Sequence, residues 1–261
     1  MKRTSCGAAK QPAESFQTIA EQDLVEFLKR DESAAELFGR AYIEPLHTGV
    51  FFIDRHLPLR PNIVLEICGP SGSAKSELLL QAAVACLLPR TYGGISYGGN
   101  EAGVVFFDLD GKFDMLRLMQ IMEWRMSEAQ SAQQQQPTRQ QTNQVYEQSL
   151  GRLRVMRCST SFQLLAALKG VRPILKGMQE AGAAARLLLV DSVSAFYWMD
   201  RAARNAPLPP QAGARSLPHQ GVAPMTLQSV HASLAVHLRE ILHRYRCSLL
   251  VTVGAIRGEA G

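Results

Sequence analysis

The sequence predicts an α/β protein with a parallel sheet covered by helices on both faces. Two observations support this fold class. Five short apolar segments alternate with segments of helical periodicity, which is the pattern of consecutive βα units. A glycine-rich loop ending in Lys-Ser directly follows the first apolar segment, where a phosphate-binding loop lies in such folds. The carboxyl ends of the strands then share one edge of the sheet, where ligands bind in open α/β sheets.

The predicted strands are short runs rich in apolar and β-branched residues, which is the composition of buried strands. They cover residues 63–67, 104–109, 153–156, 187–190 and 248–253. The fourth run, LLLV, is apolar throughout, as expected for a strand that is covered on both faces. Between the strands, apolar residues recur three and four positions apart and predict amphipathic helices. These helices cover residues 75–88, 113–126, 162–180 and 227–245.

Residues 1–45 precede the core and are expected to form a tail with short helices. Two capping-box spacings, Thr18 to Glu21 and Ser33 to Glu36, predict where these helices begin. The helices fit two interpretations: a helical cap on the core, or a docking arm for another subunit.

Two segments of the core, which covers residues 46–261, differ in composition from the rest. Residues 130–148 hold nine glutamines and few apolar residues, and residues 202–224 are rich in Ala, Pro and Gly. Neither segment has enough apolar side chains to offset the entropy that is lost on ordering. We therefore predict a mobile insertion at each place.

The composition excludes several classes of protein. Of the 261 residues, 46% are apolar and 20% are charged, which excludes a wholly disordered chain and a coiled coil. The longest apolar stretch, residues 78–88, is far shorter than the roughly 20 residues of a membrane span. The five cysteines lie far apart and lack metal-binding spacing, which predicts free thiols in a reducing compartment. The formal net charge of +5 permits a polyanionic partner without requiring one.

The loop GPSGSAKS follows the first predicted strand and opens the first predicted helix. It fits the phosphate-loop pattern G-x-x-x-x-G-K-S/T except that Ala74 replaces the second glycine. In such a loop the backbone N–H groups form an anion nest, to which the helix N-terminus adds positive charge. Lys75 is expected to contact the β- and γ-phosphates, and the Ser76 hydroxyl to bind Mg²⁺. The predicted nucleotide-binding residues are Gly69, Pro70, Ser71, Gly72, Ser73, Ala74, Lys75 and Ser76.

The alanine in this loop leaves two alternatives open. If φ of Ala74 is negative, its methyl group is tolerated. If φ is positive, a strain of about 1–2 kcal/mol weakens the site without abolishing it.

Acidic residues follow two other predicted strands at the same edge of the sheet. Asp191 ends the run LLLV and has the position of the carboxylate that holds Mg²⁺, usually through water, in P-loop NTPases. Asp108 and Asp110 end the strand that covers residues 104–109. A carboxylate at this place could orient or deprotonate an attacking water. An Asp110–Gly111 turn explains the same pattern, and the spacing alone favours the turn.

Two longer segments resemble a known family. Residues 106–118, FFDLDGKFDMLRL, and residues 191–201, DSVSAFYWMDR, are similar to the RecA-like strand-exchange recombinases of eukaryotes. Among these, they resemble a paralogue that does not form filaments, and the resemblance runs from about residue 33 to the end, apart from the two insertions. It implies a RecA-like core that binds ATP and Mg²⁺, and a role in the nucleus in double-strand-break repair by homologous recombination. It also implies a complex with other recombinase paralogues, chiefly the one lettered D, which contacts DNA.

Three positions depart from the pattern of this family. The family has D-x-E-G-x-F after the second strand, with the glutamate as catalytic base, and Asp110 stands at that position. Gly254 stands where the family carries a glutamine that senses the γ-phosphate, and Ala74 stands in the phosphate loop. A misplacement of about 1 Å can cost about a hundredfold in rate. The departures predict an ATP-binding subunit with weak or absent hydrolysis, in which Asp110 is the candidate catalytic residue.

Two other functions are weighed against this one. An active DNA-dependent ATPase that takes part directly in strand exchange would need catalysis to proceed with Asp110 and Gly254. A metabolic P-loop kinase would need a lid rich in arginine, and neither insertion has that composition. The cores of the resembled family also carry further strands beyond the last predicted one, so we expect a core that is incomplete at its C-terminus.

Overall fold

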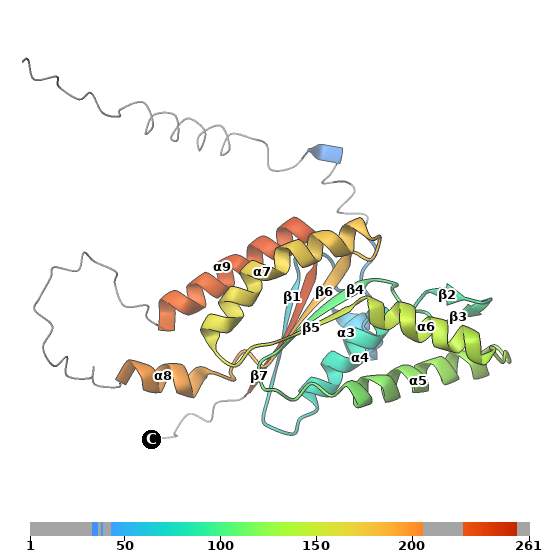
Figure 1. Cartoon of the computed structure of the whole chain (residues 1–261), viewed down its shortest axis with the longest axis horizontal. Coiled ribbons are helices and arrows are strands. Elements are labelled where there is room, and N and C mark those ends of the chain that lie inside the picture. Colours follow the sequence, from blue (N-terminus) through green and yellow to red (C-terminus); the bar gives the residue numbers. More distant parts are fainter. Residues whose placement is uncertain (1–32, 36–37, 39–42, 206–226, 255–261) are drawn as a thin grey trace, which may run out of the picture. The chain divides into compact units, whose positions relative to one another are not determined.

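The structure, a computed structural model, describes residues 33–35, 38, 43–205 and 227–254. The chain divides into two compact units, residues 1–43 and 44–261. In the first unit, Ala34, Ala35 and Phe38 are helical, close to the predicted helix start at Ser33. The predicted helix at Thr18 lies outside the described residues. The second unit contains the sheet (Figure 1).

Five strands form this sheet, in the order β1-β7-β6-β4-β5. They are β1 (Val64–Gly69), β4 (Gly103–Asp108), β5 (Leu153–Arg157), β6 (Ala185–Asp191) and β7 (Ser248–Gly254). All neighbouring strands pair in parallel, so the predicted α/β class with a parallel sheet is confirmed. The carboxyl ends of the strands therefore align along one edge, where Gly69 pairs with Gly254 and Asp108 with Asp191.

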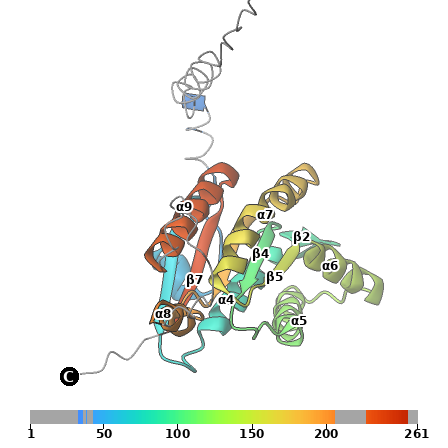
Figure 2. The same ribbon diagram turned by 60° about the vertical axis from the view of Figure 1, so that its left-hand side comes forward.

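Helices cover both faces of the sheet. One face carries α4 (Lys75–Leu87), α5 (Met115–Ala132) and α6 (Arg139–Gly151), and the other carries α7 (Ser161–Glu180) and α9 (Leu227–Tyr245). Figures 1 and 2 show α7 and α9 side by side, across the sheet from α4 and α5. The remaining described elements are shorter: α3 (Phe51–His56), α8 (Tyr197–Asn205) and an antiparallel hairpin of β2 (Thr91–Tyr92) and β3 (Ile95–Ser96). Most of the second predicted insertion, 202–224, lies outside the described residues.

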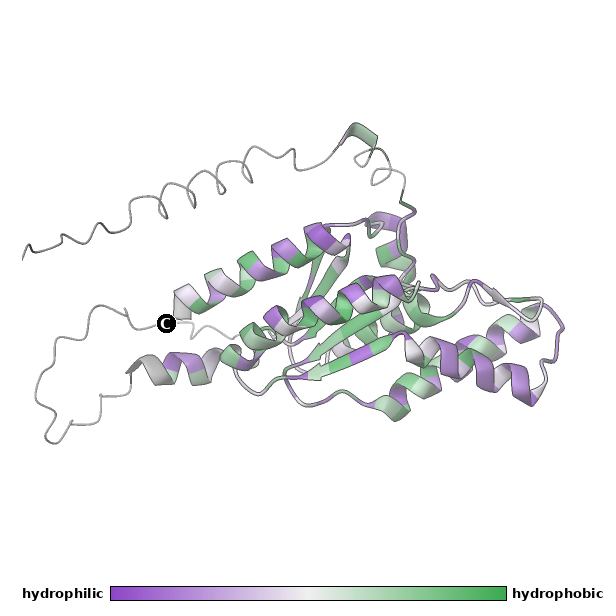
Figure 3. Ribbon diagram, turned by 45° about the horizontal axis from the view of Figure 1, so that its top comes forward, coloured by the Kyte–Doolittle hydropathy of each residue, from purple (hydrophilic) through white to green (hydrophobic). Residues whose placement is uncertain are grey.

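The central strand β4 shows why the strand sequences are apolar at successive positions. All six of its residues are buried. Val104 and Phe106 belong to the core beneath α4 and α5, while Val105 and Phe107 belong to the core beneath α7 and α9. Successive side chains of a strand point to opposite faces, so a central strand of a two-sided sheet needs apolar residues throughout. Figure 3 accordingly shows mostly green strands, with purple concentrated on helices and loops.

The glutamine-rich segment 130–148 differs from its prediction as a mobile insertion. It forms the end of α5 and most of α6. A capping box at Thr138 begins α6, and Val145 of this helix is fully buried. The Gln133 side chain also binds the hairpin, because its Oε1 accepts from Ser96 N at 2.9 Å and its Nε2 donates to Ser96 O at 2.8 Å. Amide hydrogen bonds and one buried valine thus hold a segment that has few apolar residues.

Candidate functional site

Two glycines lie in or next to the loop between β1 and α4. A Cβ atom at Gly69 would lie 2.7 Å from Ser73 Oγ, so a side chain there would displace the Ser73 hydroxyl. Gly72 has φ +81°, in the region that favours glycine. The loop curls back on itself, because Ser73 Oγ donates to Pro70 O at 2.9 Å. The backbone can therefore approach a ligand closely at this loop.

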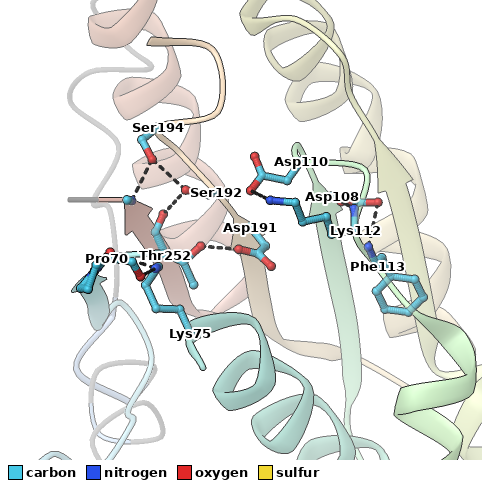
Figure 4. Close-up of polar contacts among 12 residues, drawn as sticks. Pro70, Lys75, Asp108, Asp110, Lys112, Phe113, Asp191, Ser192, Ser194 and Thr252 are labelled. Carbon is cyan, nitrogen blue, oxygen red and sulfur yellow. Dashed lines mark hydrogen bonds and ion pairs between the residues drawn. The ribbon is translucent and has the colours of Figure 1, made fainter. Parts of the chain in front are cut away.

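Lys75 reaches back over the loop that precedes it. Its Nζ donates to Gly69 O at 2.9 Å and to Pro70 O at 2.7 Å, and it lies 3.4 Å from Ser73 Oγ (Figure 4). Lys75 is also the first residue of α4, so its ammonium group and the positive end of the helix act at the same place. This arrangement is typical of an anion site at a helix N-terminus.

Ala74 has a positive φ, which is the strained one of the two conformations considered for it. Its φ is 58° and its ψ is 20°, a left-handed conformation at the N-cap of α4. Its carbonyl accepts from Leu78 N at 3.0 Å, while its methyl group offers no cap to the helix. The left-handed conformation costs an alanine about 1–2 kcal/mol. This strain is present without any ligand, so it lowers the stability of the folded loop whether or not a nucleotide is bound.

The other predicted loop residues lie near the surface. Ser71 and Ser76 are exposed, the first within the loop and the second on the first turn of α4 beside Lys75. Behind them, Glu77 forms a two-pronged ion pair with Arg117 of α5, with distances of 2.7 and 3.1 Å. The Arg117 guanidinium holds the pKa of Glu77 below its usual range. This pair links the start of α4 to α5.

Asp191 is a nearly buried carboxylate at the end of β6. Its side chain is 6% exposed, and its Oδ1 accepts from Thr252 Oγ1 of β7 at 2.5 Å. Since β7 lies between β1 and β6, Asp191 and the phosphate loop share one edge of the sheet. Figure 4 shows Lys75 and Asp191 on this edge. The predicted magnesium-binding residues therefore belong to elements at the same edge of the sheet, Ser76 to the first turn of α4 and Asp191 to the end of β6.

Serine hydroxyls join the ends of β6 and β7 next to Asp191, which sequence reasoning missed. Ser192 Oγ donates to Thr252 O at 3.1 Å and lies 2.9 Å from Ser194 Oγ. Gly254 N in turn donates to Ser194 Oγ at 2.8 Å. A Cβ atom at Gly254 would lie 3.1 Å from that hydroxyl. Gly254, which stands where the resembled family has glutamine, is thus held by a hydrogen bond from its backbone N–H.

The two aspartates after β4 have different environments. Asp108 is 1% exposed, and its carboxylate accepts from Lys112 N at 3.0 Å and from Phe113 N at 3.3 Å. Its Oδ2 also lies 3.4 Å from Arg157 Nε. The Asp108 carboxylate therefore holds the turn that follows the strand, and Gly111, with φ +68°, makes that turn possible.

Asp110 belongs to this turn and also lies beside Asp191. The backbone N–H groups of Leu109 and Asp110 donate to Asp191 O at 2.6 and 3.3 Å. The Asp110 side chain is 27% exposed, and its Oδ2 lies 3.3 Å from Lys112 Nζ. Asp110 therefore forms the turn that the spacing favoured, and its carboxylate also lies at the sheet edge. Its catalytic role stays a prediction. The sequence did not indicate that a lysine neutralises this carboxylate.

Two kinds of feature are absent from the part of the chain that the structure describes. Within residues 43–205 and 227–254, no group of three or more His, Cys, Asp or Glu side chains is placed to hold a metal ion. No described helix has the length and apolarity to cross a membrane.

Comparison with known proteins finds relatives that are named for DNA repair and recombination. The DNA repair protein XRCC2 homolog of Arabidopsis thaliana is 31% identical over 241 residues, which are 83% of this chain and 62% of the relative. DNA repair protein XRCC2 of Mus musculus is 34% identical over 177 residues, or 66% of this chain and 55% of the relative. DNA repair and recombination protein RadA of Methanoculleus marisnigri is 27% identical over 153 residues, or 59% of this chain and 42% of the relative.

The chain thus spans less than two thirds of the length of these relatives. No family model matches it. The identities to the XRCC2 proteins nevertheless extend over most of the chain, and the match to RadA agrees with the parallel sheet. The chain is therefore a relative of the DNA repair protein XRCC2 and, at lower identity, of the recombinase RadA, and its core is RecA-like.

Proposed function

We propose that the chain is an ATP-binding subunit of a complex of recombinase paralogues that acts in double-strand-break repair by homologous recombination. The similarity to proteins named for DNA repair and recombination supports this role. The observation that carries the ATP-binding part is the position of Lys75, which lies over a glycine loop at the sheet edge that also holds Asp191.

The residues at this edge fit a nucleotide with Mg²⁺. A side chain at Gly69 would displace the Ser73 hydroxyl, and a side chain at Gly72 would be strained by its positive φ, so the two glycines suit a loop that a phosphate approaches closely. Residues 69–76 would hold the phosphates, with Lys75 as the cation. Ser76 and Asp191 offer the oxygen ligands that Mg²⁺ prefers, the latter through water. When bound, the magnesium ion neutralises phosphate charge.

The geometry supports binding of ATP more than its hydrolysis. Asp108 has both carboxylate oxygens engaged by the turn. Asp110 is one methylene shorter than the glutamate of the resembled family and is paired with Lys112. Gly254 has no side chain that could sense a phosphate. ATP would then act as a structural or switching ligand with slow turnover.

The partners and the compartment follow from the resemblance. The partners would be other recombinase paralogues, chiefly the one lettered D, with DNA bound by the assembled complex. The work of such a complex is done in the nucleus. These proposals concern the whole protein, since the relatives are longer than this chain.

The test of ATP binding is Lys75→Ala in the full chain. Loss of this charge-assisted contact should weaken MgATP binding by about 2–4 kcal/mol, measured by equilibrium titration. Lys176→Ala is the matched control, because this lysine is paired with Glu180 on the exposed side of α7. A folded Lys75→Ala variant that binds MgATP as tightly as the natural chain would refute the site.

Two further measurements test the other parts of the proposal. Turnover of ATP should be slow and little stimulated by DNA. A fast, DNA-stimulated rate that Lys75→Ala abolishes would instead favour the active ATPase. Co-purification with partner paralogues should survive Lys75→Ala, and failure of the natural chain to associate with any of them would exclude the complex.

A further inference from the structure

We propose that Lys112 is a second cation of the phosphate site and that it recognises the third phosphate of ATP. The inference rests on the proposed nucleotide site and names the residue that would distinguish ATP from ADP. It follows from how the turn after β4 is built, which edge it faces, and how weakly the Lys112 side chain is held.

The backbone of this turn is fixed from three sides. Asp108 accepts from the N–H groups of Lys112 and Phe113. The Phe113 ring packs on Phe106 of β4, with 4.9 Å between ring centroids. On the other side, Asp110 N donates to Asp191 O. A buried carboxylate and an aromatic contact thus hold the Cα atom of Lys112 at a set place on the sheet edge.

The side chain of Lys112, in contrast, is held loosely. It is 71% exposed, and its ion pair with the Asp110 carboxylate spans 3.3 Å. Exposed pairs of this kind contribute little to stability, so the ammonium group can exchange its partner at small cost. A phosphate offers several charged oxygens, and charge-assisted hydrogen bonds to such groups are among the stronger ones in proteins.

The order of the strands indicates which phosphate Lys112 meets. Along the sheet the order is β1, β7, β6, β4, with neighbouring strands about 4.8 Å apart. Lys75 lies over the end of β1, and Asp191 ends β6. A phosphate chain that starts in the loop and is directed toward Asp191 therefore extends toward β4. Its terminal phosphate would then be the one closest to Lys112. Figure 4 shows Lys75, Asp191 and Lys112 along this edge.

The negative charges at this edge favour a cation at residue 112. Asp191 and Asp110 place two carboxylates on the edge toward which the terminal phosphate would extend. Like charges at short range repel, and Lys75 lies on the opposite side of the site, over the end of β1. A second cation at residue 112 offsets this repulsion when the third phosphate is present and pairs with Asp110 when it is absent.

The test compares MgATP and MgADP binding by the full chain and three variants. Lys112→Met should weaken MgATP binding about tenfold and MgADP binding by less than twofold, in line with the loss of one charged contact. Lys112→Arg keeps the charge and should keep most of the preference for MgATP. Lys176→Met removes a charge far from the site, on α7, and should change neither affinity.

Each outcome decides between the possibilities. Equal loss of both nucleotides in Lys112→Met, or no loss of either, would overturn the role of Lys112 while the phosphate loop stands. The same loss in Lys176→Met would mean that only net charge matters. If the natural chain binds neither nucleotide, the proposed function fails and the inference fails with it.

Discussion

Replacing Ala74 by glycine should stabilise the protein, although it removes a methyl group. The left-handed backbone at this residue costs alanine about 1–2 kcal/mol. Glycine releases that strain but gains freedom in the unfolded chain, which costs about 0.4–1 kcal/mol. Glycine is also a better N-cap than alanine. The net expectation is a gain of about 0.5–1 kcal/mol in the free energy of unfolding, or a rise in Tm of about 1–4 °C.

The measurement is denaturant unfolding of the natural chain and of Ala74→Gly, with Ala129→Gly as the matched control. Ala129 lies within α5, where the same change should destabilise by about 0.5–1 kcal/mol because the backbone is right-handed. The two variants should therefore shift the unfolding midpoint in opposite directions. If Ala74→Gly destabilises as much as Ala129→Gly, the conformation of the phosphate loop described above is wrong.

Two further predictions concern stability. Burial raises the pKa of the Cys86 and Cys247 thiols from 9.0 to about 12, so their contribution to stability is complete below pH 9 and is lost as pH rises toward 12. Under reducing conditions Cys86→Ala should flatten this alkaline decline of the unfolding free energy, and an unchanged slope would contradict the assignment. Deleting residues 131–146 would be harmless for a mobile insertion, but it removes the buried Val145 and should cost about 2–4 kcal/mol in denaturant unfolding. An unchanged midpoint would restore the original interpretation.

The parts of the fold that could be predicted are those determined by local pattern. Each central strand is apolar because both of its faces are covered, and the phosphate loop is a contiguous motif whose glycines have local causes. The helix α6 could not be predicted from its composition. Part of its support comes from Gln144, whose Oε1 accepts from the hydroxyl of Tyr92 in a hairpin about fifty residues earlier in the chain. Such non-local hydrogen bonds leave no periodicity. The capping box at Thr138 was the one local signal for it.

The same limit applies to the candidate site. A residue type does not reveal its φ, so the strain at Ala74 stayed open until the backbone was known. Two aspartates two positions apart look alike in the sequence. Their difference in burial depends on where the turn folds back, and that depends on Asp108 binding N–H groups four and five residues later.

Asp108 and Asp110 differ in whether they could serve as the general base for ATP hydrolysis. A general base needs a free carboxylate oxygen within hydrogen-bond reach of the attacking water. Asp108 has both oxygens engaged by the turn, so the role falls to Asp110. While Lys112 is paired with Asp110, that carboxylate is neutralised as well. If the third phosphate draws Lys112 away, Asp110 becomes free only when ATP is bound, and it is then still one methylene shorter than a glutamate. A site built in this way senses the third phosphate more readily than it cleaves it, which is the behaviour expected of a subunit that uses ATP as a switch.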